Sequence, residues 1–367
     1  MTLTNYWWLL IWLAMAGGFC AVFFPRRTVT VAGTQEYRWG WLPAIIISVP
    51  YVIWAMNRSN FGDTETYRCI FYGAPSSVGQ IASCLAEHAK DKGFSVFTIL
   101  LKSIIGNSDK IFFLIIAAIQ IFCVVYFFRK YSYNFLMSMF MFVASTDYLS
   151  WVFNGMRQFL AVCIVLFSFE FVLKKKYVPA VVLILIASTI HGSALIMLPI
   201  IFVVQGKAWN KRTVFTALVF VIGIVFIDRF TSILDTLLTE TQYSDMITNE
   251  IWTTDDGTNI FRILFYSIPA IMSLIWKKHI DAGNNKQINM FVNCTAITAF
   301  LYAISGVSSG IYVGRLPIYT TLAGYVAVPW MIDHIFTESS ARIVKMGFVL
   351  VYLVFFYFQM HMAWEII

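Results

Sequence analysis

The sequence predicts an all-α polytopic integral membrane protein. Of its 367 residues, 59% are hydrophobic and only 12% are charged, whereas roughly 25% of residues are charged in a typical soluble domain. Apolar runs recur along the chain, and each is long enough to cross a hydrocarbon core of ~30 Å as a helix. A β-barrel would instead show alternating segments of ~10 residues. The composition therefore excludes an ordinary soluble fold.

The apolar runs predict the spans in order. The first, Asn5 to Phe24, has no basic leader and no small-residue cleavage site, so we expect a retained span and not a signal peptide. Further spans are predicted at 40–56, 111–128, 134–151, 154–173, 213–230, 260–276, 288–305, 316–335 and 343–362.

Clusters of Lys and Arg between the spans predict the orientation. Short cytoplasmic loops carry an excess of these residues, whereas the loop 231–259 is acidic and contains neither, so we expect it outside. The same clustering accounts for the net charge of +7 without nucleic-acid binding. The predicted cytoplasmic residues are Arg26, Arg27, Arg38, Arg129, Lys130, Lys174, Lys175, Lys176, Lys207, Lys211, Arg212, Lys277, Lys278, Arg342 and Lys345.

The stretch 177–204 does not fit a layout in which each apolar run crosses the membrane once. Basic loops flank it on both sides, and we expect both loops in the cytoplasm. One helix of this length would extend about 42 Å and would need strong tilt. His191 and Gly192 stand midway among Ser and Thr residues. We expect two half-length helices that turn at His191, with one tilted helix as the alternative. Counting the halves separately gives about 11–12 segments.

The segment 57–110 is the largest hydrophilic stretch, and we expect it outside. Near 92–106 its apolar residues have helical spacing, with Lys102 off the apolar stripe. This pattern predicts a helix that lies in the membrane–water interface on the outer side of the membrane. Cys69 and Cys84 share this segment, and both a disulfide and two thiols stay open. Because no repeat or separate soluble domain is visible, residues 1–367 are expected to form a single transmembrane domain.

Several charged residues fall at the outer ends of the predicted spans. A charge at mid-span costs on the order of 2.5–3.5 kcal/mol, so each charge needs a reason. Arg157 has polar and small neighbours, and Arg315 follows a glycine-rich approach, so both are expected to face the bundle interior. Arg262 either joins them or snorkels to the headgroups. Inward arginines suit a diphosphate ligand.

The chain contains no nucleotide-binding loop, no zinc-ligand spacing and no Gly-x-Ser-x-Gly motif. We therefore expect neither a metal nor a cofactor. His191 reads either as a structural hydrogen-bonding residue or as a base.

The chain contains five short motifs, in this order: Asp63-x-x-x-Tyr67, Asp91-Lys92-Gly93-Phe94, Asn154-Gly155-Met156-Arg157-Gln158-x-x-Ala161, His191-Gly192-Ser193-Ala194-Leu195 and Gly314-Arg315. In order and spacing, over most of the chain, they resemble the landmarks of one bacterial family, the EpsG-type, Wzy-like polysaccharide polymerases. One departure is Asp91-Lys92-Gly93-Phe94, where that family usually has Glu-Pro-Gly-Tyr.

The resemblance implies a GT-C-like glycosyltransferase bundle in the bacterial inner membrane. Such an enzyme transfers a growing glycan from its undecaprenyl-diphosphate carrier to a new lipid-linked repeat unit at the periplasmic or outer face. It serves O-antigen, capsule or exopolysaccharide synthesis, uses no nucleotide sugar, and has membrane lipid and a chain-length regulator protein as partners.

Residue roles follow as expectations. Arg157, Arg315 and Arg262 would hold the diphosphate. A carboxylate would deprotonate the acceptor hydroxyl; Asp63 is the first choice, followed by Asp91 and His191. Glycan contacts are expected from Tyr67, Asn154 and Gln158. The alternatives are a flippase for lipid-linked oligosaccharides, and an outer-face ligase or acyltransferase with His191 as its base.

Overall fold

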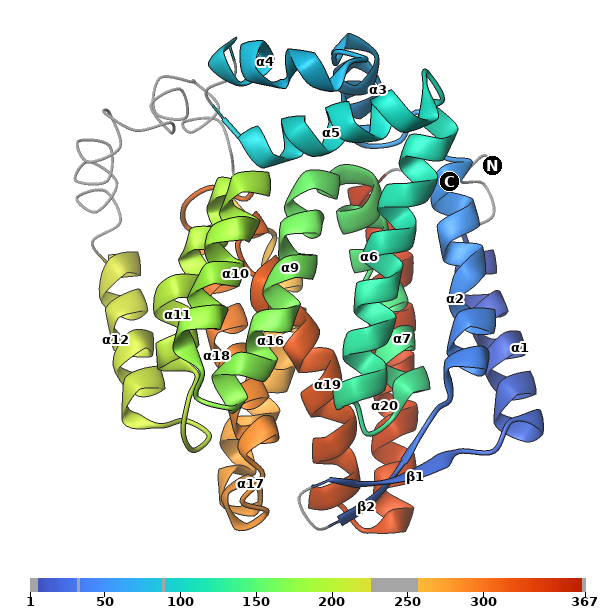
Figure 1. The fold of residues 1–367 in the computed structure, drawn as a ribbon. Helices are drawn as coiled ribbons and strands as arrows, with labels where there is room; N and C mark the ends of the chain where they lie inside the picture. Colours follow the sequence, from blue (N-terminus) through green and yellow to red (C-terminus); the bar gives the residue numbers. More distant parts are fainter. Residues whose placement is uncertain (1–5, 32–33, 88–89, 226–256, 365–367) are drawn as a thin grey trace. The chain divides into compact units, whose positions relative to one another are not determined.

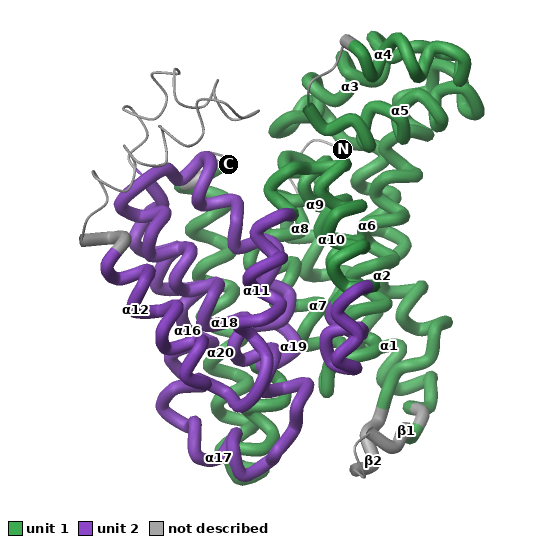
Figure 2. The backbone as a smooth tube through the Cα atoms, turned by 60° about the vertical axis from the view of Figure 1, so that its left-hand side comes forward, with its two compact units in different colours: residues 1–168, 179–194, 328–367 green, residues 169–178, 195–327 purple. Residues whose placement is uncertain are grey.

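The computed structural model describes residues 6–31, 34–87, 90–225 and 257–364, and Figure 1 shows the fold. The predicted acidic loop 231–259 lies almost wholly outside the described residues. The chain forms two compact units, coloured separately in Figure 2. Unit 1 consists of Met1–Ser168, Pro179–Ala194 and Val328–Ile367, and unit 2 of Phe169–Val178 and Leu195–Ala327.

Helices make up almost all of the described structure, as the sequence predicts. Each predicted span coincides with a helix or with a pair of helices. The elements that lie in unit 1, or begin or end there, are α1 (Trp8–Phe23), β1 (Arg27–Val31), β2 (Thr34–Arg38), α2 (Trp41–Met56), α3 (Thr64–Gly73), α4 (Ile81–Glu87), α5 (Lys92–Ile105), α6 (Asp109–Tyr131), α7 (Phe135–Ala144), α8 (Asp147–Leu149), η3 (Ser150–Asn154), α9 (Met156–Leu173), α10 (Tyr177–Ile190), η4 (Gly192–Ile196), α19 (Ile318–Ile335) and α20 (Glu338–Phe358). Those of unit 2 include α11 (Met197–Val203), α12 (Lys211–Val225), α16 (Ile260–Ile275), α17 (Lys277–Ala282), α18 (Lys286–Ser305) and η5 (Val313–Arg315).

Length and composition make this a multi-pass membrane protein. Among the described residues, four helices are long and apolar enough to cross a membrane, and a fifth span results if α7 and the following segment 147–154 count as one. Five shorter apolar helices accompany them. Many of their large side chains, such as Phe19, Phe261 and Met346, are exposed, as helices that face lipid require.

One small sheet interrupts the helical pattern. β1 pairs with β2 as an antiparallel hairpin, with Arg27 opposite Arg38. The hairpin connects α1 to α2 at the end of unit 1 away from α3, α4 and α5 (Figure 1).

The break predicted at His191 is present. α10 ends at Ile190, and a short 3₁₀-helix from Gly192 to Ile196 precedes α11. A single continuous α-helix over 177–204 is therefore excluded.

A second break was not predicted. The expected span 134–151 stops at Ala144, and the segment Asp147–Asn154 departs from α7 at an angle of 70°. Thr146, at the break, has a left-handed backbone with φ of 66°. Ser145 and Thr146 are wholly buried, and Ser145 Oγ accepts from the Asp147 N–H. This local hydrogen bond competes with continued helix, which is why a polar run can end an apolar helix.

The segment 57–110 forms helices that lie across one end of the unit 1 bundle (Figure 1). The predicted helix near 92–106 is present as α5, but one expectation about its faces was wrong. Lys102 is only 4% exposed, and its Nζ donates to the carbonyls of Tyr72 and Ala74 at 2.7 and 2.6 Å. The lysine thereby satisfies carbonyls at the C-terminal end of α3. Ile104, an apolar residue of the same helix, is exposed.

Candidate functional site

The site is built where the chain turns from η3 into α9. Residues Ser150–Asn154 form a π-helix, and the Gly155 N–H donates to the Ser150 carbonyl at 2.9 Å before α9 begins at Met156. π-helical turns are rare and occur frequently at functional sites. This irregular turn carries Asn154 and presents Arg157 in the first turn of the next helix.

Two buried polar side chains donate hydrogen bonds to backbone carbonyls at this turn. Neither residue was expected at the site from the sequence. Arg58 Nη1 donates to the Val152 carbonyl at 3.0 Å, and Gln120 Nε2 donates to the Met156 carbonyl at 2.8 Å. Arg58 also sits 4.5 Å from the ring centroids of Phe113 and Phe153. Burial lowers the pKa of Arg58 to about 10, so the side chain stays charged at neutral pH. The only feature of the sequence that points to Arg58 is its position as a single arginine directly after an apolar run.

An ion pair joins Asp91 to Arg157. The Oδ2 atom of Asp91 lies 3.1 Å from Nη1 of Arg157, and the side chains are 15% and 34% exposed. The Oδ1 atom of the same carboxylate accepts from the Gly192 N–H at 3.2 Å. Three sequence landmarks, on α5, α9 and the α10 break, thus meet at one carboxylate.

The backbone before α5 is shaped for this contact. Asp91 has a φ of 51°, a left-handed conformation that Asp tolerates better than most residues. A Cβ at Gly93 would lie 2.9 Å from both the Cβ and the carbonyl carbon of Thr189, and closer still to its hydroxyl. Only glycine therefore allows α5 to start this close to the end of α10. The Asp91-Lys92-Gly93-Phe94 motif keeps the acid and the glycine, the two features that the geometry requires.

Two aromatic side chains, Tyr67 and Phe94, contact Arg157. The Tyr67 hydroxyl accepts from the Arg157 N–H at 3.2 Å, and Tyr67 meets Phe94 edge to face with ring centroids 6.1 Å apart. The Arg157 guanidinium carbon lies 5.9 Å from the Phe94 ring centroid, within the range of a cation–π contact. Both rings belong to a buried cluster with Phe71, Phe112, Phe113, Ile116, Met156 and Leu160.

A hydrogen-bonded chain continues from α9 to His191. Gln158 Nε2 donates to Ser193 Oγ at 3.1 Å, and Ser193 Oγ lies 2.7 Å from His191 Nδ1. The Ser193 N–H also donates to Nδ1, at 3.4 Å. Because a backbone N–H can only donate, Nδ1 is the acceptor in this contact, and neutral His191 carries its ring proton on Nε2.

Asp63 and Asn154 lie on the same side of the site. A Cβ at Gly62, whose φ is 55°, would lie 3.1 Å from Asn154 Oδ1. Asp63 precedes α3 and makes no side-chain cap hydrogen bond to that helix. Tyr67 follows one helical turn later, on the same face, where it contacts the Arg157 backbone.

Burial of the Asp91 carboxylate changes its protonation equilibrium. Burial raises the pKa of Asp91 above its ordinary value, and the positive charge of Arg157 and the Gly192 N–H offset only part of this effect. The Arg157 Nε atom is buried and has no hydrogen-bond partner among the described residues. The guanidinium therefore keeps donor capacity beyond its ion pair.

The two other predicted arginines lie in unit 2. The Thr258 N–H donates to the Ser305 carbonyl at 2.8 Å, which ties the residues before α16 to the end of α18. A Cβ at Gly314 would lie 2.7 Å from Thr258 Oγ1. Arg262 and Arg315 therefore belong to the same end of α18. Arg315 is exposed, and the Arg262 guanidinium carbon lies 5.8 Å from the stacked rings of Tyr266 and Tyr302.

Two further expectations concern cysteines and metals. Cys69 and Cys84 are not joined by a disulfide in the structure. Among the described residues no group of three or more His, Cys, Asp or Glu side chains is arranged to hold a metal ion.

Seven of the nine predicted site residues, Asp63, Tyr67, Asp91, Asn154, Arg157, Gln158 and His191, thus gather in unit 1, and Arg262 and Arg315 share one end of unit 2. Comparison with known proteins gives one match: the model of the EpsG family fits residues 41–364. No curated protein matches, and neither does any solved structure.

Proposed function

Because this chain belongs to the EpsG family, we propose that it is a polysaccharide polymerase that uses a polyprenyl-diphosphate-linked donor. It transfers the growing glycan to a hydroxyl of a new lipid-linked repeat unit at the outer face of the inner membrane. The bond from the anomeric carbon to the diphosphate breaks, a glycosidic bond forms, and the acceptor proton passes to a base. The observation that carries this proposal is the Asp91–Arg157 ion pair beside the break at Gly192.

Arg157 binds the donor diphosphate and stabilises the charge that develops as it leaves. Preorganised cations lower a barrier most when they face charge that appears in the transition state. Asp91 holds one edge of the guanidinium, and Tyr67 holds the backbone N–H of the same residue. The cation is therefore oriented before substrate arrives. Arg262 and Arg315, which share one end of unit 2, are proposed to bind a lipid diphosphate as well.

Asp63 is the base in this proposal. Asp91 is committed to Arg157 and to the Gly192 N–H, so proton abstraction by Asp91 would release the arginine that it orients. His191 presents an Nε2–H, which suits a hydrogen bond to a sugar hydroxyl or to a phosphate oxygen. Tyr67, Asn154 and Gln158 line the place where α3 meets α9 and contact the glycan.

An assay with purified protein and lipid-linked repeat units tests the proposal, because only a polymerase produces a ladder of chain lengths. A flippase produces no ladder, and a ligase or acyltransferase adds a single group. Arg157→Ala should abolish the ladder. Arg157→Lys should leave little activity, because lysine keeps the charge but loses the planar fork that grips phosphate oxygens.

The matched control is Arg342→Ala, which removes one exposed arginine from a predicted cytoplasmic loop. It should polymerise as the unaltered chain does. If Arg157→Ala and Arg315→Ala both give a full ladder in well-folded samples, the assignment of these arginines to the diphosphate is wrong.

A further inference from the structure

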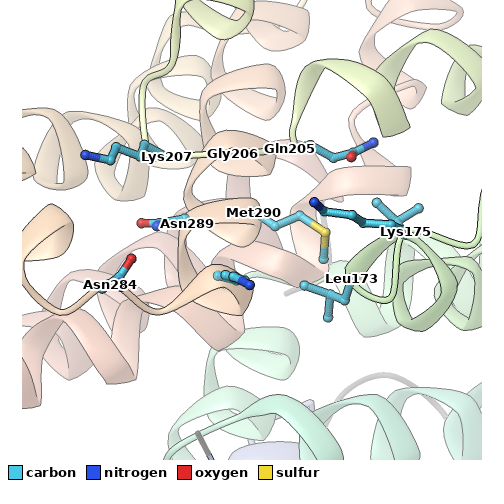
Figure 3. Close-up of a pocket in the computed structure, with 10 residues that line it drawn as sticks. Leu173, Lys175, Gln205, Gly206, Lys207, Asn284, Asn289 and Met290 are labelled. Carbon is cyan, nitrogen blue, oxygen red and sulfur yellow. The ribbon is translucent and has the colours of Figure 1, made fainter.

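A second, separate site lies at the other end of unit 2. The end of α9, the loop 205–207 and the start of α18 enclose a pocket of about 280 Å³. Figure 3 shows Asn289 and Met290 in the middle, with Lys175 on one side and Lys207 on the other. The lining residues are Val172, Leu173, Lys175, Gln205, Gly206, Lys207, Asn284, Lys286, Asn289 and Met290.

The charge of this pocket is entirely positive. Lys175, Lys207 and Lys286 reach it from three different segments, and its lining contains no acidic residue. The nearest acids along the chain are already paired: Glu170 with Lys174, and Asp281 with Lys277. The N-terminus of α18 also begins at the pocket, and its dipole adds partial positive charge. The pocket therefore favours an anion.

Asn289, one of the lining residues, has a buried polar atom without a partner among the described residues. Asn289 is 4% exposed, and its Oδ1 atom is buried and accepts no hydrogen bond from any described residue. A buried acceptor of this kind needs a donor. A ligand that carries a hydroxyl next to its phosphate would satisfy it.

The walls are held in place without a ligand. Asn293 Nδ2 donates to the Val204 and Lys207 carbonyls at 3.0 Å, and Asn293 Oδ1 accepts from the Trp209 N–H at 2.8 Å. The Tyr177 hydroxyl donates to Gln205 Oε1 at 2.7 Å. The backbone of Lys207 is thus anchored to α18, and the pocket is prebuilt.

The pocket and the arginine end of unit 2 lie at opposite ends of one helix. α18 begins at Lys286 beside the pocket and ends at Ser305 beside Thr258. A helix of 20 residues is about 30 Å long, close to the thickness of a hydrocarbon core. All three pocket lysines belong to loops that the distribution of positive charge assigns to the cytoplasm.

We propose that this pocket binds a phosphate group that carries a neighbouring hydroxyl, the chemistry of a glycerol phosphate. Its source is the headgroup of an anionic lipid of the phosphatidylglycerol type in the cytoplasmic leaflet, or a soluble glycerol phosphate. The lysines neutralise the phosphate, and a glycerol hydroxyl donates to Asn289 Oδ1. Basic pockets between helices on the cytoplasmic side are typical sites for anionic headgroups. This proposal does not depend on the polymerase chemistry.

Native mass spectrometry of the full chain in detergent tests it, with dioleoyl phosphatidylglycerol and dioleoyl phosphatidylethanolamine as probes. The pocket variant is Lys175→Gln/Lys207→Gln/Lys286→Gln. The control variant is Lys176→Gln/Lys211→Gln/Lys278→Gln, which removes the same number of positive charges from neighbouring segments but from residues that do not line the pocket. Phosphatidylglycerol binding should weaken by about tenfold or more in the pocket variant and should hold in the control.

Two further measurements separate the sources and test the hydroxyl contact. If glycerol 3-phosphate in solution binds the unaltered chain but not the pocket variant, while phosphatidylglycerol binds both alike, the ligand is the soluble one. Asn289→Leu should weaken phosphatidylglycerol binding more than binding of phosphatidic acid, whose headgroup lacks the glycerol hydroxyls. If the pocket variant and the control variant bind phosphatidylglycerol equally and also bind glycerol 3-phosphate equally, the proposal is overturned.

Discussion

Gly93 offers the sharpest test of how the site is assembled. A methyl group there would lie 2.9 Å from two carbon atoms of Thr189. Overpacking of this kind typically costs about 1–3 kcal/mol, whereas exchanging Gly for Ala in a helix returns roughly 1 kcal/mol. Because the overlap also involves backbone, we expect Gly93→Ala to destabilise unit 1 by about 2 kcal/mol. At ~2–4 °C per kcal/mol, its Tm should fall by about 4–8 °C.

The same variant should lose polymerisation, because α5 must move away from α10 and carries Asp91 with it. Thermal unfolding of the purified protein and the ladder assay measure the two effects. The matched control is Gly73→Ala, also in a helix of the 57–110 segment, where an added Cβ meets nothing within 4 Å. Adding Thr189→Gly to Gly93→Ala removes part of the overlap and should restore part of both losses. If Gly93→Ala and Gly73→Ala have the same Tm and the same activity, the required close approach of α5 to α10 is refuted.

Three further predictions follow from the same contacts. Because burial raises the pKa of Asp91, its carboxylate gains a proton at a higher pH than an exposed Asp does, so the ladder-forming rate should fall as the pH is lowered towards that raised pKa. Asp91→Asn, which keeps the left-handed backbone accessible, should be slow and should lose the contribution of Asp91 to this acid limb. Arg58→Met leaves the Val152 carbonyl without its donor and should cost about 1–3 kcal/mol of stability, seen as a lower Tm that Arg342→Met, at an exposed position, does not produce. Lys102→Met deprives the carbonyls at the end of α3 of their donor, so amide hydrogen exchange in α3 should rise while exchange in α16 stays unchanged.

Hydropathy alone located the helices, because the transfer of a helix into lipid depends on a sum over contiguous residues. The break at His191 was also predictable, since basic loops on both sides of 177–204 demanded it. The break at Ser145 and Thr146 was not, because a polar pair inside an apolar run is compatible with a continuous span. Only the buried hydrogen bond of Ser145 and the left-handed backbone of Thr146 show that the helix ends there.

For the candidate site too, some properties could be predicted from the sequence and others depend on the tertiary structure. Charge distribution along the sequence assigned Asp63, Asp91, Arg157 and His191 to one side of the membrane, which is a property of loop order. Which side chains pair with one another, in contrast, depends on three-dimensional packing. That Asp91 pairs with Arg157, that Gly93 must be a glycine, and that Arg58 caps a π-helical turn all depend on segments far apart in the chain.

The membrane-spanning character of this protein was therefore determined by the sequence by itself, because it follows from local composition, and the side on which its charged landmarks lie stays a prediction from the sequence. Which carboxylate holds the arginine, which nitrogen of His191 carries the proton, and that lysines from three loops line one pocket were decided only by the tertiary structure. The physical reason is the distance along the chain over which each property is determined. The transfer of a segment into lipid depends on its own residues, whereas an ion pair or a pocket forms only when segments far apart in the chain pack together.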